Sequence, residues 1–450
     1  MAVEEVDLIV IGSGQGGVPL AIDFAKAGKR VVLFERGELG GTCVNSGCTP
    51  SKAFLASAHN AGRARLAASL GIHAEVRVDQ RAVMARVRRV RAVWRDGIGP
   101  KLQTAGVEVA FASAAFSGER TVRGGGREIR ATTVVIDTGA SAAIPAIDGI
   151  SKVPYLTNAT FFDLEVLPER LTVIGAGYIG LELGQGAQRL GSKVTIVHGE
   201  DRVMEREEPD ASAVIRSAFE RDGIAFRFNA RATSVAHAGS TFRVALADGS
   251  TLESDGLLIA TGRHANSADL ATENSNVTLA KNGTVVVDEY LRTTCPGVYA
   301  IGDVAGQPAF THVSWEDFRR IRSTLAGTPR RRDDRVLSYS TFTEPQLART
   351  GLTEDEAKVK GLEVRAVTLQ LADVARGAEW DLEAGFYRLV VDARSDKILG
   401  ATMVGYETAE LVHAIGFAIE LGATWRNLDA FVGIHPTFGE GLPSLARLLE

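Results

Sequence analysis

The sequence predicts an α/β fold in which parallel strands alternate with helices, followed by a smaller C-terminal α+β region. Short apolar runs such as DLIVIG, VVLFE, TTVVIDTG, LTVIGAG, KVTIVH and GLLIATG alternate with helical stretches, as in parallel sheets with helical crossovers. Residues 6–35 and 171–198 repeat one plan of apolar strand, glycine-rich turn, helix and second strand. From about residue 336 hairpin-like strands precede helices, which indicates a separate α+β domain.

Length and charge limit the possible classes of function. The chain has 450 residues, more than the roughly 250 to 300 at which one core stops growing, so we expect several domains with room for a large ligand between them. Its 50 basic and 55 acidic side chains give a net charge of -5, which provides no field for gathering nucleic acid. The N-terminal stretch MAVEEVDLIVIG is acidic, unlike a secretory signal, and no uncharged apolar run approaches the roughly 18 residues of a membrane span. We therefore expect a soluble cytoplasmic protein that binds neither nucleic acid nor membrane.

The first glycine-rich turn, VIGSGQGG, has the fingerprint of a dinucleotide site. Gly12, Gly14 and Gly17 permit a tight turn and close backbone approach, so that a pyrophosphate rests on the N-terminus of the following helix. Glu35 ends the next apolar strand, where an acid binds ribose hydroxyls. The fingerprint alone is weak evidence, but a strand before it, a helix after it and the acid together predict a bound dinucleotide.

The second glycine-rich turn, VIGAGYIG, repeats this pattern with one difference. Gly175, Gly177 and Gly180 form the fingerprint, but the second strand ends in His198, where an NAD-binding protein carries Asp or Glu. His198 and the nearby Arg202 could instead accommodate a 2′-phosphate. The sequence therefore favours NADPH over NADH at this turn.

The segment GGTCVNSGCTPSK is the most specific feature of the chain. Cys43 and Cys48 are five positions apart, and a helix with a loosened first turn could bring their sulfurs within bonding reach. Zinc needs about four ligands, and the only other cysteine, Cys295, lies far away in the sequence. Three cysteines are too few for a disulfide framework in a chain of this length. We expect no metal site, and any disulfide is more consistent with catalysis than with a structural role.

Together these motifs resemble the pyridine nucleotide-disulfide oxidoreductases of the glutathione reductase, lipoamide dehydrogenase and mercuric reductase group. The resemblance covers essentially the whole chain. It rests on seven motifs in the family's order: VIGSGQGG, GGTCVNSGCTPSK, VVIDTGA, VIGAGYIGLE, LLIATGR, TTCPGVYAIGDVAG and HPTFGEG.

The resemblance implies the domain order. Two Rossmann-like domains would bind FAD and NAD(P), and a C-terminal α+β domain would form a homodimer with an active site shared across subunits. The FAD-binding domain would be split into residues 1–150 and 266–335, with the NAD(P)-binding domain at 151–265 and the dimerisation domain at 336–450.

The resemblance also assigns cofactor contacts. Asp303 would accept hydrogen bonds from the ribityl chain of FAD, while the following helix N-terminus faces phosphate. Tyr178 matches the residue that covers the nicotinamide pocket. Further expected cofactor contacts lie in the same motifs: Thr42, Gly139 and Gly262.

For catalysis, the resemblance implies a relay from NAD(P)H through FAD to the cysteine pair. Cys48 would be the charge-transfer thiolate beside the flavin, and Cys43 would be the interchange thiol that meets the acceptor. Four further residues match the family's ion pair beside the flavin ring, Lys52 and Glu182, and its acid/base dyad, His435 and Glu440, contributed by the partner subunit.

These assignments predict an FAD-dependent NAD(P)H:disulfide oxidoreductase that acts on a small-molecule or small-protein disulfide. The alternatives are a metal-ion reductase for mercury or copper, a dihydrolipoamide dehydrogenase, and a redox-sensing flavoprotein without turnover. Ile22 and Asp23 stand where glutathione reductases carry arginine, which argues against glutathione. The chain ends SLARLLE, without the C-terminal cysteine pair of mercuric reductases.

Overall fold

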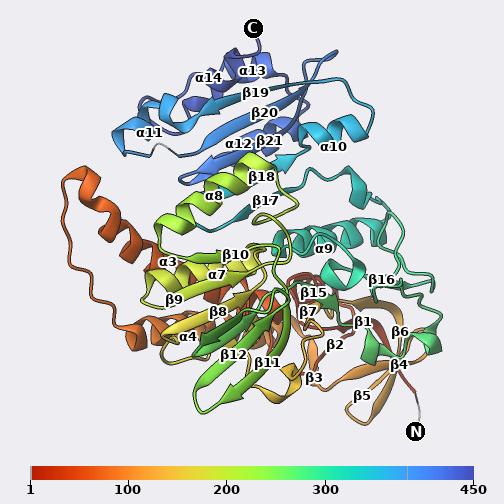
Figure 1. Ribbon diagram of the computed structural model, residues 1–450. Coiled ribbons are helices and arrows are strands. Elements are labelled where there is room, and N and C mark those ends of the chain that lie inside the picture. The colour runs from red at the N-terminus through yellow and green to blue at the C-terminus, as the bar shows by residue number, and fades with distance from the viewer. Residues whose placement is uncertain (1–2, 383) are drawn as a thin grey trace.

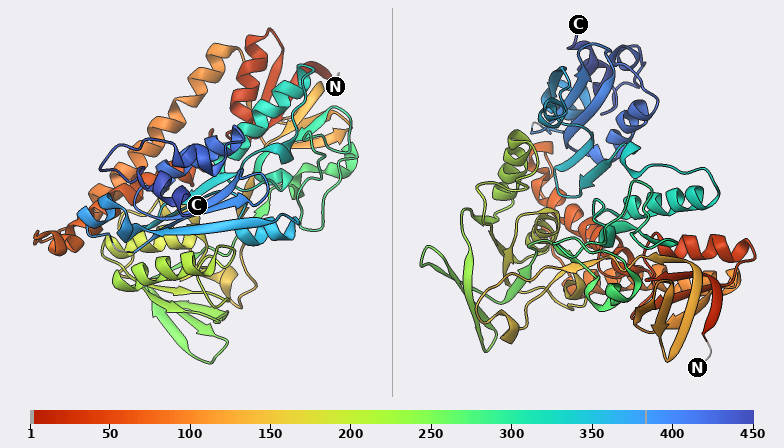
Figure 2. Two further views of the ribbon diagram at one scale, coloured as in Figure 1. Left: turned by 90° about the horizontal axis from the view of Figure 1, so that it is seen from above. Right: turned by 90° about the vertical axis from the view of Figure 1, so that its right-hand side faces the viewer.

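The computed structural model describes residues 3–382 and 384–450 and arranges them in three lobes, each built around at least one β-sheet (Figure 1). The second view in Figure 2 separates the three lobes clearly, with the C-terminal lobe opposite the N-terminal strands. The chain is of mixed α/β class with a C-terminal antiparallel sheet, which confirms the predicted fold class. No helix within the described ranges is both long and apolar enough to cross a membrane.

The first sheet has seven strands from two distant parts of the chain. Parallel strands β2, β1, β6 and β16 form its centre, and β16 enters the sheet more than 160 residues after its neighbour β6. Residues on both sides of the intervening region therefore share one core. The strands are β1 (Glu4–Ile11), β2 (Val31–Glu35), β3 (Glu108–Phe111), β4 (Ala114–Gly118), β5 (Thr121–Gly124), β6 (Arg127–Ile136) and β16 (Val298–Ala300).

The intervening region forms a second parallel sheet in the order β10-β9-β8-β14. A three-stranded antiparallel sheet packs beside it, and the two-stranded ladder of β7 and β15 runs between the first two lobes. The strands are β7 (Ala140–Ala142), β8 (Arg170–Ile174), β9 (Lys193–Val197), β10 (Ala225–Arg227), β11 (Ala232–Ala238), β12 (Thr241–Leu246), β13 (Thr251–Ser254), β14 (Gly256–Ile259) and β15 (Arg263–Ala265).

The C-terminal lobe is a five-stranded antiparallel sheet in the order β17-β18-β21-β20-β19. Helix α12 packs on β18 and β21, and α14 packs on β19 and β20. The elements are β17 (Ser338–Thr341), β18 (Gln346–Gly351), α10 (Glu354–Val359), β19 (Val364–Gln370), α11 (Ala375–Glu379), β20 (Phe386–Asp392), β21 (Ile398–Gly405), α12 (Thr408–Glu420), α13 (Trp425–Asp429) and α14 (Gly441–Arg447).

Helices α3 and α7 meet at the boundary between the first two lobes, and both carry residues of the site. Helix α3 packs against α4 and α7, and Phe54 of α3 forms edge-to-face contacts with Phe161 and Phe162. At Gly186 of α7 an added Cβ would lie 2.3 Å from the Phe54 ring, so glycine is required for this close approach. The α-helices outside the C-terminal lobe are α1 (Gly17–Lys26), α2 (Gly41–Asn45), α3 (Cys48–Leu66), α4 (Gln80–Asp96), α5 (Ile98–Ala105), α6 (Asn158–Phe161), α7 (Tyr178–Arg189), α8 (Pro209–Arg221) and α9 (Thr311–Leu325), with short 3-10 turns between elements.

Candidate active site

A cavity of about 2150 Å³ runs through the centre of the molecule and is lined by residues of all three lobes. Pockets for a single drug-sized ligand span roughly 300 to 1,000 Å³, so this cavity has room for more than one large ligand. Both glycine fingerprints, both cysteines of the GGTCVNSGC segment and the N-terminus of α9 line it. The structure thus brings together both fingerprint turns and the cysteine pair that the sequence singled out.

The first fingerprint turn is tight because its glycines lie against a buried carboxyl. An added Cβ would fall 2.3 Å from the Asp137 carbonyl oxygen at Gly12 and 2.6 Å from Asp137 Oδ2 at Gly14. The Gly17 amide donates to the same Oδ2 at 2.7 Å. Burial raises the pKa of Asp137 well above its usual range, and the nearby charges of Asp303, Asp317 and Glu35 act in the same direction. Sequence reasoning missed Asp137, although it lies inside the motif VVIDTGA.

Glu35 stands at the end of β2 and faces this turn. Its Oε2 accepts hydrogen bonds from the Ser13 amide at 3.0 Å and the Ser13 hydroxyl at 2.6 Å. The carboxylate lines the cavity, and its remaining lone pairs can accept from ribose hydroxyls.

The second fingerprint turn opens helix α7. Gly175 has φ +109, and an added Cβ there would lie 2.3 Å from the Ala260 carbonyl oxygen. At Gly180 an added Cβ would lie 2.0 Å from the Gly175 carbonyl oxygen, so the turn and the helix pack too closely for any other residue. Gly177 is the N-cap of α7, which places the helix N-terminus toward the cavity.

His198 lines the cavity beside this turn, whereas Arg202 does not. The Ala176 amide donates to His198 Nδ1 at 3.3 Å, and Nε2 lies 3.3 Å from Glu205 Oε2. Arg202 donates to the Glu205 carbonyl oxygen at 2.8 Å and pairs with Asp201. Two arginines that the sequence reasoning did not select line the cavity instead: Arg206 and Arg231.

The two cysteines of the motif lie on two separate helices. Cys43 belongs to α2 and Cys48 begins α3, because the intervening Gly47 has φ -127 and ψ -121 and interrupts the helix. The expected single helix with a loosened first turn is therefore a break between two helices. An added Cβ at Gly47 would lie 2.8 Å from the Thr42 carbonyl oxygen, so glycine permits the tight turn.

The surroundings of the two thiols shift their pKa values in opposite directions. Hydrogen bonding from Cys43 is the largest cause that lowers the pKa of Cys48, to about 6, and the Thr311 hydroxyl and the Lys52 charge add to it against burial. Cys48 Sγ lies 3.1 Å from Thr311 Oγ1. The pKa of Cys43 is raised, first by its hydrogen bond to Cys48 and then by burial. These shifts favour a thiolate at Cys48 over one at Cys43.

Lys52, one turn after Cys48, donates to Glu182 Oε2 of α7 at 2.7 Å. The other carboxylate oxygen accepts from the Phe342 amide at 3.0 Å, and Lys52 Nζ lies 4.4 Å from the centre of the Phe342 ring. The ion pair is thus held by three lobes at once. Phe342 was not expected from the sequence because it lies 160 positions from Glu182.

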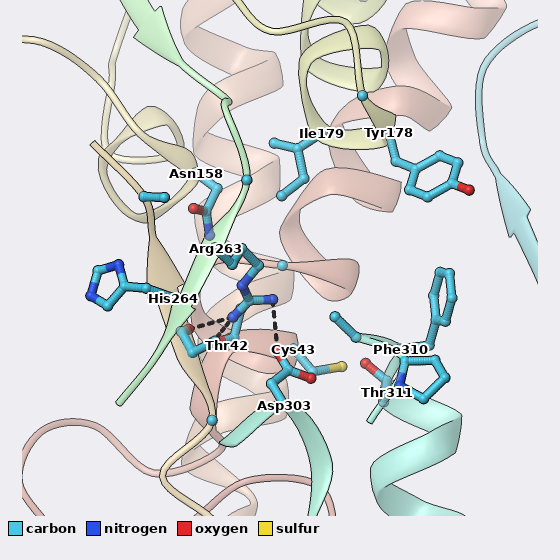
Figure 3. Close-up of a pocket in the computed structure, with 18 of the residues that line it drawn as sticks. Thr42, Cys43, Asn158, Tyr178, Ile179, Arg263, His264, Asp303, Phe310 and Thr311 are labelled. Atoms are coloured by element: carbon cyan, nitrogen blue, oxygen red, sulfur yellow. Dashed lines mark hydrogen bonds and ion pairs between the residues drawn. The ribbon is translucent and has the colours of Figure 1, made fainter. Parts of the chain in front are cut away.

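Asp303 faces Arg263 at 3.2 Å, and Arg263 also donates to Thr42 Oγ1 at 3.2 Å (Figure 3). Burial raises the pKa of Asp303, and the Arg263 charge opposes this. Arg263 Nε is buried without a hydrogen-bond partner, which marks a donor available to a ligand. Two glycines with positive φ, Gly139 and Gly262, line the cavity close to this group.

His435 and Glu440 form a pair on the C-terminal lobe. His435 Nδ1 lies 2.8 Å from Glu440 Oε2, and the His435 side chain is 73% exposed. Neither residue lines the central cavity. Within one chain the structure therefore does not bring this dyad to the cysteines.

The donor set of the cavity fits FAD and a nicotinamide dinucleotide. Two turns with amide groups at helix N-termini suit two pyrophosphates, Glu35 suits a ribose, and Asp303 with the free Arg263 donor suits a polar chain between them. Among residues 3–382 and 384–450, no group of three or more His, Cys, Asp or Glu side chains is placed to hold a metal ion. Two dinucleotide turns and a dithiol on one cavity define the class of flavin-dependent dithiol oxidoreductases.

Comparison with known proteins assigns the family. Residues 6–317 match the model of the pyridine nucleotide-disulphide oxidoreductases, and residues 337–446 match the dimerisation domain of the same family. The chain belongs to the pyridine nucleotide-disulphide oxidoreductase family. It is an FAD-dependent enzyme that uses NAD(P)H, and it forms a homodimer through its dimerisation domain.

Several relatives are similar over almost the entire chain. Mercuric reductase of Bacillus cereus is 33% identical over 97% of this chain and 70% of its own length. Dihydrolipoyl dehydrogenase 2 of Haloarcula marismortui is 32% identical over 98% of this chain and 96% of its own length. The HOCl-induced flavoprotein disulfide reductase RclA from Escherichia coli, also solved as a Cu(II) complex, superposes with a TM-score of 0.90 at 30% identity and covers 99% of this chain and 100% of its own.

Proposed function

We propose that the chain carries electrons from NADPH to the Cys43–Cys48 pair and then to a disulfide acceptor outside the protein. The observation that carries this proposal is the environment of Cys48, whose pKa is lowered to about 6 by hydrogen bonds and by Lys52. A thiolate kept at neutral pH next to a protonated partner thiol suits thiol–disulfide exchange.

FAD, when bound, supplies a carrier that accepts a hydride from NAD(P)H and passes two electrons to a disulfide. The chain's own residues then set the protonation of the products. Thr311 and Lys52 hold the Cys48 thiolate, whereas Cys43 retains a proton that must leave before it attacks an acceptor. Removing that proton requires a base, and the imidazole of His435, oriented by Glu440, has the right chemistry.

We propose that this base comes from the partner subunit. His435 is exposed and paired with Glu440 but lies outside the cavity of its own chain. Three exposed apolar side chains directly precede it in the sequence: Phe431, Val432 and Ile434. A symmetric dimer that buries this surface would place each His435 at the other subunit's cysteines.

We assign the FAD-binding domain to residues 1–150 and 266–335, the NAD(P)-binding domain to 151–265 and the dimerisation domain to 336–450. The support is sheet membership. Strand β16 joins β6 in the first sheet, strands β8 to β14 form the second and third sheets, and β17 to β21 form the last. Each of these larger sheets therefore lies within one proposed domain, and the short β7–β15 ladder joins the first two domains.

For the nucleotide, we propose NADPH, with His198 as one partner of the 2′-phosphate. Arg206 and Arg231 line the cavity near His198 and are better placed than Arg202, which is bonded to the Glu205 carbonyl. Glu205 beside His198 is an acid that could serve the ribose of NADH. The ratio of kcat/KM for NADPH and NADH tests this choice: Arg206→Gln and Arg231→Gln should lower it, while Arg202→Gln serves as the matched control.

A metal-ion acceptor is the second candidate. Mercuric reductase of Bacillus cereus is a relative, and RclA from Escherichia coli is known as a Cu(II) complex. A soft metal ion bound by the Cys43 and Cys48 thiolates would use the same relay. Steady-state turnover with Cu(II), Hg(II), lipoamide and other small disulfides would rank these acceptors, and a redox sensor would be reduced once without turnover.

The test of the relay is an anaerobic titration of the purified holoenzyme with NADPH and with NADH. We expect a long-wavelength thiolate-to-flavin charge-transfer band in the wild type and its loss in Cys48→Ala. Bleaching of the flavin without such a band in the wild type would show that the cysteines are not coupled to FAD and would refute the proposal.

A further inference from the structure

Two tyrosine hydroxyls from different lobes share one buried carboxylate oxygen at the edge of the cavity. Tyr178, the first residue of α7, donates to Glu207 Oε1 at 2.5 Å, and Tyr339 of β17 donates to the same oxygen at 2.9 Å. Glu207 is only 4% exposed. A carboxylate that accepts two hydroxyls in a dry setting forms stronger bonds than a surface carboxylate does.

The second oxygen of Glu207 faces a guanidinium. Arg349 Nη1 lies 3.5 Å from Glu207 Oε2, and Arg349 is itself paired with Glu356. Burial raises the pKa of both Tyr178 and Tyr339, and the charge of Glu207 adds to this, so both phenols remain donors. The cluster therefore joins the proposed NAD(P)-binding domain, through Tyr178 and Glu207, to the C-terminal sheet.

The ring of Tyr178 lies between the second fingerprint turn and the cysteine end of the cavity. It directly follows Gly177, and Glu182, one turn further along α7, contacts Lys52. On the other side the ring packs against Phe310 at a centroid distance of 6.2 Å, and Phe310 precedes Thr311, the hydrogen-bond partner of Cys48. Figure 3 shows Tyr178 and Phe310 on one side of the cavity, across from Arg263 and Asp303.

We infer that Glu207 is a positioning residue that latches Tyr178 in a closed position over the nicotinamide pocket, and that NAD(P)H binding requires release of this latch. The inference rests on the proposed placement of the nicotinamide next to Tyr178. Tyr339 and Arg349 form the fixed side of the latch. When the Tyr178 side chain moves away, Glu207 keeps its hydrogen bond to Tyr339 and its contact with Arg349. The buried carboxylate is therefore not left without polar partners.

A closed resting state lowers the apparent affinity for the nucleotide by the fraction of molecules that are open. Weakening the hydrogen bond between Tyr178 and Glu207 raises that fraction and therefore tightens binding. Glu207→Gln keeps the shape but replaces a charged acceptor with a neutral one, and Tyr178→Phe keeps the ring but removes the donor. Hydrogen bonds to charged groups are strong enough that each change should lower the dissociation constant about tenfold.

Glu208 provides a matched control in the adjacent position. It also bridges the two lobes, since its carboxylate pairs with Arg388 of β20 at 2.8 Å, but it does not contact Tyr178. Glu208→Gln therefore weakens the contact between lobes and leaves the latch intact. It separates a change in domain association from a change in the position of the tyrosine.

The experiment is calorimetric titration of the oxidised holoenzyme with NADP⁺ and with NAD⁺, which bind without reducing the flavin. We expect tighter binding of the preferred nucleotide by about tenfold in Glu207→Gln and in Tyr178→Phe, no further gain in the double variant, and no change in Glu208→Gln. Thermal unfolding of each variant checks that the fold is intact.

Two other outcomes would overturn the inference. If Tyr178→Phe tightens binding and a folded Glu207→Gln variant does not, Glu207 is not the latch. If Glu207→Gln and Glu208→Gln shift the constant equally, the effect comes from association of the lobes. If the wild type binds neither nucleotide, the proposed function fails as well, which distinguishes that failure from failure of the latch alone.

Discussion

Lys52 and Glu182 lie 130 positions apart in the sequence and are joined by a 2.7 Å hydrogen bond between two helices that open on the same cavity. Helix α3 begins at Cys48, and helix α7 begins at Tyr178. Because the ion pair lies one turn inside each helix, it fixes the distance between the thiol end and the nucleotide end of the site. The positive charge also reaches Cys48, whose pKa it helps to lower.

Removing the Lys52 charge should make Cys48 less acidic. In Lys52→Met the pKa of Cys48 should rise from about 6 toward that of an ordinary thiol, because a nearby cation favours the thiolate. We expect alkylation of Cys48 at pH 6 in the reduced holoenzyme to slow severalfold. The measurement is the rate of iodoacetamide labelling at Cys48, followed by mass spectrometry over a range of pH.

Two further variants test whether the charge of Lys52 causes this effect. Glu182→Gln should act in the opposite direction, since the Glu182 charge raises the pKa of Cys48. Lys101→Met on α5, an exposed lysine away from the cavity, should have no effect. Equal slowing by Lys52→Met and Glu182→Gln would mean that the ion pair acts through packing and not through its charges.

The Thr311 hydroxyl should contribute to the same acidity through its 3.1 Å contact with Cys48 Sγ. Thr311→Val keeps the shape and removes the donor, so the thiolate loses a hydrogen bond worth about 1 kcal/mol. We expect about threefold less thiolate at pH 6, and weaker charge-transfer absorbance in the reduced holoenzyme. Thr311→Ser should restore both readouts, and failure of this rescue would contradict the role of the hydroxyl.

The sequence predicted the fold class, the family's cofactors and the enzyme class, and these predictions are confirmed. They succeeded because each dinucleotide turn is a local pattern of strand, glycines and helix, which one stretch of sequence displays in full. The C-terminal α+β region was also recognisable in the sequence, because hairpin-like strands precede helices there.

Contacts made over long separations could not be read from the sequence. Thr311 reaches Cys48 across 263 positions, and Arg263 reaches Thr42 across 221. A sequence motif also does not show in which direction a surface side chain points. Arg202 is bonded to the Glu205 carbonyl, whereas Arg206, four positions later, lines the cavity.

Cys295 should be dispensable for electron transfer. Its side chain is buried, its thiol donates to the Glu119 carbonyl oxygen at 3.2 Å, and burial raises its pKa. A thiol in this setting is a poor nucleophile. We expect Cys295→Ser to retain NADPH-dependent turnover within about twofold and to lose on the order of 1 kcal/mol of stability. Steady-state assays and denaturant unfolding test this, with Cys48→Ser as the inactive comparison.

Asp137 should make the stability of the holoenzyme depend on pH. A carboxyl with a raised pKa binds more protons in the folded state than in the unfolded state, so its stabilising contribution is present at low pH and is lost as pH rises. Asp137→Asn keeps an acceptor for the Gly17 amide and removes this titration. We therefore expect the melting temperature of the variant minus that of the wild type to increase by on the order of 2 °C from pH 5 to pH 8.

Scanning calorimetry at several pH values measures this difference. Asp137→Ala removes the acceptor of the Gly17 amide and should be destabilised by about 1 to 3 kcal/mol at every pH. A difference between Asp137→Asn and wild type that does not change with pH would contradict a raised pKa for the buried Asp137 carboxyl.

The proposed sharing of the active site can be tested by mixing two inactive subunits. Cys43→Ser lacks the proposed nucleophile and His435→Gln lacks the proposed base, and each homodimer should have at most about 1% of wild-type turnover with a disulfide acceptor, the size of loss typical of a general base. In a mixed dimer, the site that combines Cys43 of one subunit with His435 of the other is wild type. Random exchange of subunits makes about half of all dimers mixed, so about a quarter of wild-type activity should return.

If each chain instead used its own His435, every site in the mixed dimer would carry one defect and no activity would return. The structure favours recovery, because His435 is 73% exposed and lies outside the cavity that holds the cysteines of its own chain. Flavin reduction by NADPH, which does not involve His435, should be unchanged in the His435→Gln homodimer. A slower reduction there would indicate that the substitution damages the fold and not the proton transfer.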